Sequence, residues 1–154
     1  MEWLEATALA EWVRTSFIGY PLALTLHSIG MAVMVGLVFV VNLRFLGMFR
    51  RIPYTSLDRM LSIAWIGFVI NLCSGLVIFT SQASFYITSA PFLLKIAMVI
   101  LGALTVRYMA PIIRRDAAGW TDGSAAVSKM KTLAIGSLAM WSIAIITGRF
   151  TAYL

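Results

Sequence analysis

Ionisable and redox-active side chains are scarce in this chain. Its 154 residues include one cysteine and one histidine, and only 12% of them are Asp, Glu, Lys or Arg. A single cysteine excludes an intrachain disulfide. The sequence also has no zinc-ligand cluster, no Gly-rich phosphate loop and no Ser/His/Asp set. These absences remove the usual sequence signatures of metal-dependent hydrolysis, nucleotide binding and nucleophilic catalysis.

Apolar residues, in contrast, make up 61% of the chain, and its mean hydropathy is +0.93. A chain of this length cannot bury so much apolar surface in one soluble core, so the composition indicates an integral membrane protein. A helix needs roughly 20 apolar residues to cross about 30 Å of hydrocarbon. Such runs occur over residues 18–43, 60–80, 91–110 and 133–148. We therefore predict an all-α polytopic membrane protein, with one four-helix transmembrane bundle over residues 18–154.

The segment before the first span, residues 1–17, is amphipathic. It begins with Glu2 and Glu5, whereas a cleavable signal begins with basic residues. Its tryptophans, Trp3 and Trp12, are a residue type that favours the membrane–water interface. We predict a short interfacial helix that anchors the chain, and a lid over a site beneath the interface is the alternative.

Basic residues gather at one end of the predicted bundle. Nine of the twelve Lys and Arg residues flank the first and third links between spans, whereas only Arg14 and Arg149 lie on the opposite side. Because short cytoplasmic loops carry Lys and Arg, this asymmetry predicts a bacterial inner-membrane protein with both termini in the periplasm. No basic patch is interleaved with exposed aromatics, so we expect the lipid bilayer, and no nucleic acid, as a partner. The nine residues are Arg44, Arg50, Arg51, Arg59, Arg107, Arg114, Arg115, Lys129 and Lys131.

His27 is the first candidate site residue. It lies in an apolar run, Ile18 to Val41, that contains no other basic residue and no Asp or Glu. An ionisable residue in a membrane span is costly, and it usually faces the bundle interior, a ligand or a water-filled path. The alternative is a neutral imidazole that is bonded to a hydroxyl or a backbone carbonyl.

Lys95 is the second candidate. Pro21 and Pro91 suit the first turns of their helices, and His27 and Lys95 follow them by six and four residues. Both helices run inward from the outer face, so the two basic groups are expected at comparable depth, where one ligand could touch both. The alternative for Lys95 is that its ammonium group reaches out to the interface.

Further candidate ligands share the face of His27. Met31 and Met34 follow it at helical spacing, and imidazole with thioether is a ligand set for haem or Cu(I), although simple packing is the alternative. Asn71 in the second span is a candidate polar contact to His27. A single chain cannot give two histidines to one haem. The second axial position is therefore Met, Lys, water, an open site or the same histidine of a neighbouring subunit.

Small residues recur every four positions in three of the spans, which allows close helix approach. These stripes predict helix-packing seams and assembly into a homo-oligomer or with other membrane subunits. No span contains Asp or Glu, so a carboxylate proton relay or acid–base pair is unsupported. The three stripes are Ser28/Ala32/Gly36, Gly67/Asn71/Gly75 and Gly136/Met140/Ala144/Gly148.

Three motifs in residues 20–110 carry a resemblance to known families. They are Leu26-His27-x2-Gly30-x5-Gly36-x5-Asn42-Leu43-Arg44-x-Leu46-Gly47, then Ser74-Gly75, then Pro91-Phe92-x2-Lys95. Together they resemble a family of small uncharacterised bacterial four-helix membrane proteins. More distantly, they resemble the haem-dependent membrane protoporphyrinogen oxidases and the membrane domain of copper-resistance D proteins. Those families share His-x2-Gly in a first span, an Arg near its inner end and an aromatic-x2-Lys that opens a later span.

The distant resemblance implies that His27 is a haem b ligand and that Lys95 is a ligand or works close to the reaction centre. It also implies that Arg44 is a structural or substrate-side charge. Phe92 stands where the oxidases tend to have Trp, so the implied site is a membrane-embedded redox site rather than a porphyrinogen oxidase in particular.

Two classes of function follow from these observations. The first is a haem b redox or electron-transfer protein, or the haem-bearing subunit of a membrane complex. In it, His27 is the axial ligand, and Lys95 or Arg149 neutralises the propionates. The second is a cofactor-free structural or copper-handling membrane subunit that assembles through its small-residue faces.

Overall fold

The computed structural model describes residues 2–151, and this part of the chain contains helices and turns without any strand. Four helices are long and apolar enough to cross a membrane. The predicted all-α four-helix bundle is confirmed, and the chain is a multi-pass membrane protein. The four long helices are α3 (Gly19–Phe45), α4 (Leu57–Ser81), α6 (Ala90–Asp116) and α7 (Ala125–Phe150), and the shorter elements are α1 (Glu2–Glu5), α2 (Ala8–Thr15), η1 (Tyr54–Ser56), α5 (Ala83–Thr88) and η2 (Ala117–Gly119).

The long helices extend beyond the apolar runs from which they were predicted. α6 continues to Asp116 because Arg114 and Arg115 occupy its last turn, where basic side chains interact favourably with the helix dipole. α7 begins at Ala125, where the Ser124 hydroxyl accepts a hydrogen bond from the backbone N–H of Val127. Charged and capping residues therefore set the ends of these helices, whereas hydropathy marks only the ends of the apolar runs.

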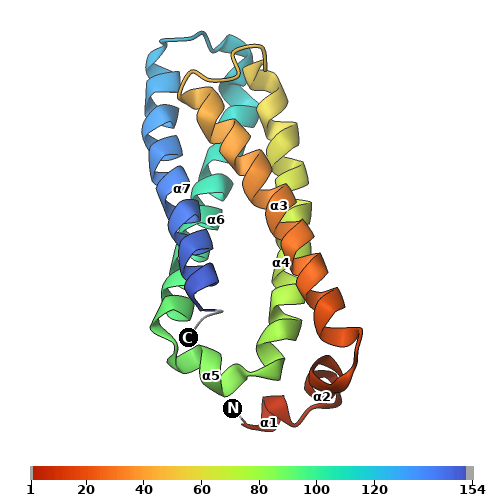
Figure 1. The fold of residues 1–154 in the computed structure, drawn as a ribbon. Coiled ribbons are helices and arrows are strands. Elements are labelled where there is room, and N and C mark those ends of the chain that lie inside the picture. The colour runs from red at the N-terminus through yellow and green to blue at the C-terminus, as the bar shows by residue number, and fades with distance from the viewer. Residues whose placement is uncertain (1, 152–154) are drawn as a thin grey trace.

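The four long helices form two hairpins. α3 packs along α4, α6 packs along α7, and contacts between α3 and α7 join the pairs. Figure 1 shows the hairpins close together at the end formed by the links 46–56 and 117–124, which we call the basic end. They are further apart at the opposite end, where α1, α2 and α5 lie together with both chain termini. We call this the terminal end.

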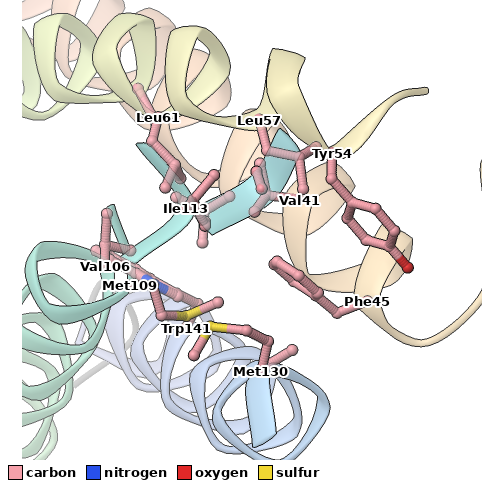
Figure 2. Packing of buried hydrophobic residues seen from close by; sticks show 14 of the residues in the cluster. Val41, Phe45, Tyr54, Leu57, Leu61, Val106, Met109, Ile113, Met130 and Trp141 are labelled. Carbon is pink, nitrogen blue, oxygen red and sulfur yellow. The ribbon is translucent and has the colours of Figure 1, made fainter. Parts of the chain in front are cut away.

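The apolar core lies mainly in the basic half of the bundle (Figure 2). It is built from the last turns of α3 and α6 and the first turns of α4 and α7, the parts of the four helices nearest the links. Toward the terminal end the core stops near Met34 and Trp141. The distribution of buried side chains thus matches the separation of the hairpins. Core residues include Val41, Phe45, Leu57, Leu61, Met109, Ile113, Met130 and Ala134.

Arg44 ties the two links of the basic end together. Its side chain is 5% exposed, and its Nε donates to the Ile52 carbonyl at 2.7 Å. Its Nη1 lies 3.1 Å from both the Tyr54 hydroxyl and Oδ1 of Asp122, and the Tyr54 hydroxyl donates to the same carboxylate oxygen at 2.6 Å. The pKa of the Asp122 carboxyl is lowered, first by the hydrogen bond from Tyr54 and then by that from Arg44. Arg44 therefore joins the two links through these hydrogen bonds, as a structural charge would.

The N-terminal segment is helical, as predicted, but forms two pieces. Thr7 separates α1 from α2 because its hydroxyl accepts from the backbone N–H of Ala10 and so caps α2. The segment is fixed to the link between the hairpins, since Glu5 accepts from the backbone N–H of Ser84 at 2.7 Å, a contact that lowers the Glu5 pKa. Trp3 stays 71% exposed, which suits an interfacial anchor.

Candidate functional site

A cavity lies between the two hairpins in the terminal half of the bundle. It has two adjoining lobes of about 150 Å³ and about 270 Å³. His27 of α3 and Lys95 of α6 line both lobes, so these two basic side chains lie beside one space. Three further residues are common to the lobes, namely Gly75, Phe79 and Phe92.

Asn71 of α4 holds His27 through two hydrogen bonds. Nδ1 of the imidazole lies 2.9 Å from the Asn71 backbone oxygen, and Nδ2 of Asn71 donates to the His27 backbone oxygen at 2.8 Å. A carbonyl oxygen can only accept, so Nδ1 carries the proton and the neutral ring keeps a lone pair on Nε2. Within residues 2–151, Nε2 has no hydrogen-bond partner. The imidazole is thus satisfied on one side by a backbone carbonyl and has a free nitrogen on the other.

Each basic side chain lies against a glycine of the neighbouring helix. A Cβ at Gly75 would lie 2.9 Å from Cε1 and 3.2 Å from Nδ1 of His27, and a Cβ at Gly148 would lie 3.2 Å from Cδ of Lys95. Both glycines belong to stripes that the sequence assigns to helix packing. In the structure they make the space that His27 and Lys95 occupy.

The described part of the cavity wall contains no carboxylate. Nor does the part of the chain from 2 to 151 give the Lys95 ammonium a salt bridge, because the ion pairs there join Arg44, Arg114 and Arg115 to aspartates. The cavity consequently combines one neutral nitrogen ligand, one ammonium group and apolar walls. This combination suits a ligand that is mostly apolar and carries negative charge.

Three aromatic rings line the cavity toward the terminal end. Phe79 of α4 and Phe92 of α6 stack with ring centroids 5.8 Å apart, and Tyr86 of α5 lies 5.1 Å from Phe92. Burial raises the pKa of the Tyr86 phenol, and nearby Tyr20 adds to this effect. The Tyr86 hydroxyl therefore remains a proton-bearing donor at neutral pH.

The other predicted site residues lie elsewhere. Met34 is buried in the core and lines a small separate void beside Trp141, while Met31 packs against the same core. Arg149 is exposed at the end of α7, next to Gly148. None of these three is among the described residues that line the lobes with His27 and Lys95. Asn71 does line the larger lobe, as its predicted contact to His27 requires.

Sequence reasoning missed the contribution of α5. No helix was predicted between the spans 60–80 and 91–110, yet α5 lies in this link and brings Tyr86 to the cavity. Phe85 and Tyr86 are adjacent aromatic residues within that link, and they were the available signal for a membrane-facing element.

No protein-family model, curated protein or solved structure matches this chain. Its geometry and chemistry are therefore the basis for any functional conclusion.

Proposed function

We propose that the cavity binds haem b through His27, and that the protein is a redox or electron-transfer protein or the haem-bearing subunit of a membrane complex. One observation carries this proposal. His27 donates its Nδ1 proton to the Asn71 carbonyl, which leaves the Nε2 lone pair in a cavity that Lys95 shares. Metal-binding histidines are typically oriented in this way, with the second nitrogen donating to a carbonyl or carboxylate.

The residues present fit such a group. A haem b held by histidine would need an imidazole ligand, apolar walls for the macrocycle and a cation near its acidic groups. His27 supplies the ligand, the stacked rings of Phe79 and Phe92 supply a wall, and Lys95 supplies the cation. When bound, the haem would supply one-electron chemistry. The protein's own contribution is to orient His27 through Asn71, to exclude water with the aromatic wall and to neutralise negative charge with Lys95.

The positions of the methionines favour haem over copper. A Cu(I) site would use thioether ligands together with the imidazole. Met31 and Met34 pack in or against the core and not in the cavity lobes, so they do not support such a site. Lys95 is the other basic side chain that lines both lobes, and it would either neutralise an acidic group of the haem or act as a further ligand to its iron.

Absorption spectroscopy of the purified protein tests the proposal. We expect a Soret band and, after reduction, α and β bands. His27→Ala should abolish cofactor retention, because it removes the ligand, while the protein still inserts. Lys95→Met should weaken retention or shift the midpoint potential, because it removes the cation.

Met31→Leu is the matched control for that experiment, since Met31 lies one turn from His27 on the same helix but outside the cavity lobes. Its spectrum should match that of the wild type. A colourless wild-type preparation that contains no metal, or a His27→Ala protein with an unchanged spectrum, would contradict the haem site.

We further propose that both termini lie in the periplasm of a bacterial inner membrane, with the basic end in the cytoplasm. The clustering of Lys and Arg at the basic end supports this orientation. A C-terminal reporter that is active only in the cytoplasm should stay inactive.

Assembly through an exposed face of α3 completes the proposal. Ser28, Ala32 and Gly36 are exposed, and a Cβ at Gly36 would meet nothing within 4 Å, so this stripe is available to a second copy or another membrane subunit. A strictly monomeric mass in lipid discs at every concentration would argue against a homo-oligomer.

A further inference from the structure

Another cavity, with a more polar lining, lies between α4 and α6 in the half of the bundle that contains the core. It has a volume of about 400 Å³. We call it the α4–α6 groove and define it by Asp58, Ser62 and Trp65 of α4 and by Arg107, Pro111 and Arg114 of α6. No residue of the groove lines the His27 cavity. Whatever binds there is therefore independent of the proposed haem.

The two arginines of the groove differ in their partners. Arg114 donates from Nε to both carboxylate oxygens of Asp58 at 3.2 Å, so this pair has no net charge. Arg107 is exposed, and the described residues offer its guanidinium group neither a salt bridge nor a hydrogen bond. The groove therefore carries one uncompensated positive charge.

The position of Arg107 makes that charge significant. It lies in the last turn of the predicted span 91–110, nine residues or about 13 Å along the helix axis before Asp116, the last residue of α6. A guanidinium group does not lose its proton in proteins, so it stays charged within the span. An arginine inside a membrane span therefore needs an anion, or water, to compensate it.

We propose that the α4–α6 groove binds the phosphate headgroup of an anionic phospholipid from the adjacent leaflet. A guanidinium group can hold a phosphate through two parallel hydrogen bonds, and Arg107 supplies this group. The indole of Trp65 is a donor type that favours the headgroup region, and the exposed side chain of Leu104, one turn deeper than Arg107 on α6, gives the acyl chain an apolar surface. Basic pockets between transmembrane helices are a known way to hold such lipids.

Charge decides which phospholipid is favoured. A zwitterionic headgroup brings its own cation, whereas phosphatidylglycerol brings a negative charge with no internal partner. A groove with a surplus of one positive charge therefore favours phosphatidylglycerol over phosphatidylcholine. The expected preference is about fivefold, the factor that corresponds to about 1 kcal/mol for one basic residue at an anionic surface.

Native mass spectrometry of the full-length protein tests this proposal. The protein is reconstituted in nanodiscs of equal parts phosphatidylglycerol and phosphatidylcholine, released into mild detergent, and analysed for retained lipid. We expect the wild type to retain phosphatidylglycerol about fivefold over phosphatidylcholine. Arg107→Gln should lose this preference.

Arg115→Gln is the matched control, because Arg115 lies on the same helix, carries the same charge, pairs with Asp116 and does not line the groove. It should keep the wild-type preference. Equal loss of preference in both variants would indicate general attraction to the basic end and would overturn the proposal. Absence of any preference in the wild type would overturn the proposal as well, and this result does not depend on whether the variants fold.

A final arm separates a lipid from a free anion. Inorganic phosphate is added to the nanodisc-derived protein, and the retained lipid is measured again. We expect phosphatidylglycerol to stay bound, because its acyl chains contribute apolar contacts that phosphate lacks. Complete displacement by phosphate would mean that the groove holds a soluble anion, and the lipid assignment would be wrong.

Discussion

Asn42 is the most deeply buried amide in the described part of the transmembrane bundle. It is 1% exposed, and its Nδ2 donates at 2.9 Å to the hydroxyl of Ser137, which is fully buried. The bond joins α3 of one hairpin to α7 of the other. In a membrane, each of these polar groups would otherwise lack a partner, so the pair favours this particular docking of the hairpins.

We predict that Asn42 and Ser137 are energetically coupled. A double-mutant cycle with Asn42→Ala and Ser137→Ala should give a coupling of about 0.6 kcal/mol and at most about 1.7 kcal/mol in the free energy of unfolding. Reversible unfolding in detergent micelles provides the measurement. Thr25→Ala is the control partner, since Thr25 is exposed and bonds only its own helix. Additive effects for Asn42 and Ser137 would show that their hydrogen bond contributes nothing.

At the same scale, the sequence was sufficient to place His27 and Lys95 beside one cavity and Asn71 next to His27. Strongly polar side chains are so rare in the spans that each is expected to face something other than lipid, and this reasoning does not depend on packing detail. It was insufficient for Met34, because a thioether suits a core as well as a metal site. Spacing along one helix identifies a face but not the neighbour that this face meets.

At the scale of helices, α3 and α4 cross at two glycines. A Cβ at Gly30 would lie 2.6 Å from the backbone nitrogen of Asn71 and 2.8 Å from the carbonyl oxygen of Gly67, and a Cβ at Gly67 would lie 2.8 Å from the backbone nitrogen of Met34. Backbone atoms of a helix cannot move aside cheaply. The crossing also brings Asn71 close enough to His27 for their two hydrogen bonds.

We predict that Gly30→Ala destabilises the protein by about 1–3 kcal/mol, the usual cost of forcing an extra carbon into a packed contact. Gly36→Ala, on the same helix, should be neutral or stabilising by up to about 1 kcal/mol, because a Cβ there meets nothing within 4 Å and alanine is the better helix former. Unfolding of both variants in micelles gives the comparison. Equal effects of the two substitutions on the free energy of unfolding would show that the close contact at Gly30 does not stabilise the protein.

The helices themselves were predictable, whereas this crossing was not. The stripe Gly67/Asn71/Gly75 was identified as a seam and does face α3. On α3, the regular stripe Ser28/Ala32/Gly36 was chosen, but the contact runs through Gly30. Small residues occur on more than one face of α3, and hydropathy cannot rank these faces because lipid and helix interior are equally apolar.

At the scale of the whole molecule, the sequence predicted the number of the spans but not the separation of the hairpins. The length of the apolar runs decides the number of spans. The separation depends on where side chains interlock, which is in the basic half, around Phe45 and Ile113. The cavity at His27 follows from that uneven distribution, so its size and its aromatic lining could not be predicted before the core was known.

The interactions of Arg44, Tyr54 and Asp122 reinforce the basic end and give the last prediction, which concerns pH. Hydrogen bonds from Tyr54 and Arg44 lower the pKa of the Asp122 carboxyl in the folded protein below its unfolded value of about 3.9. The stabilisation is therefore complete above that unfolded value and is lost as the pH falls through the lower, folded value. Asp122→Asn should lower the unfolding temperature at pH 7, and the gap to the wild type should shrink as the pH falls below about 4.

Thermal unfolding in detergent between neutral and acidic pH measures that gap directly. Because Glu5 also has a lowered pKa, the wild type has more than one acid-sensitive contact, and the difference between wild type and variant isolates Asp122. Glu11→Gln is the control, since Glu11 is exposed and has no salt bridge within residues 2–151. It should leave the unfolding temperature near that of the wild type. An Asp122→Asn gap that stays constant down to strongly acidic pH would mean that the carboxylate charge does not hold the two links together, and that the aromatic contacts of Tyr54 with Phe45 and Trp120 do so instead.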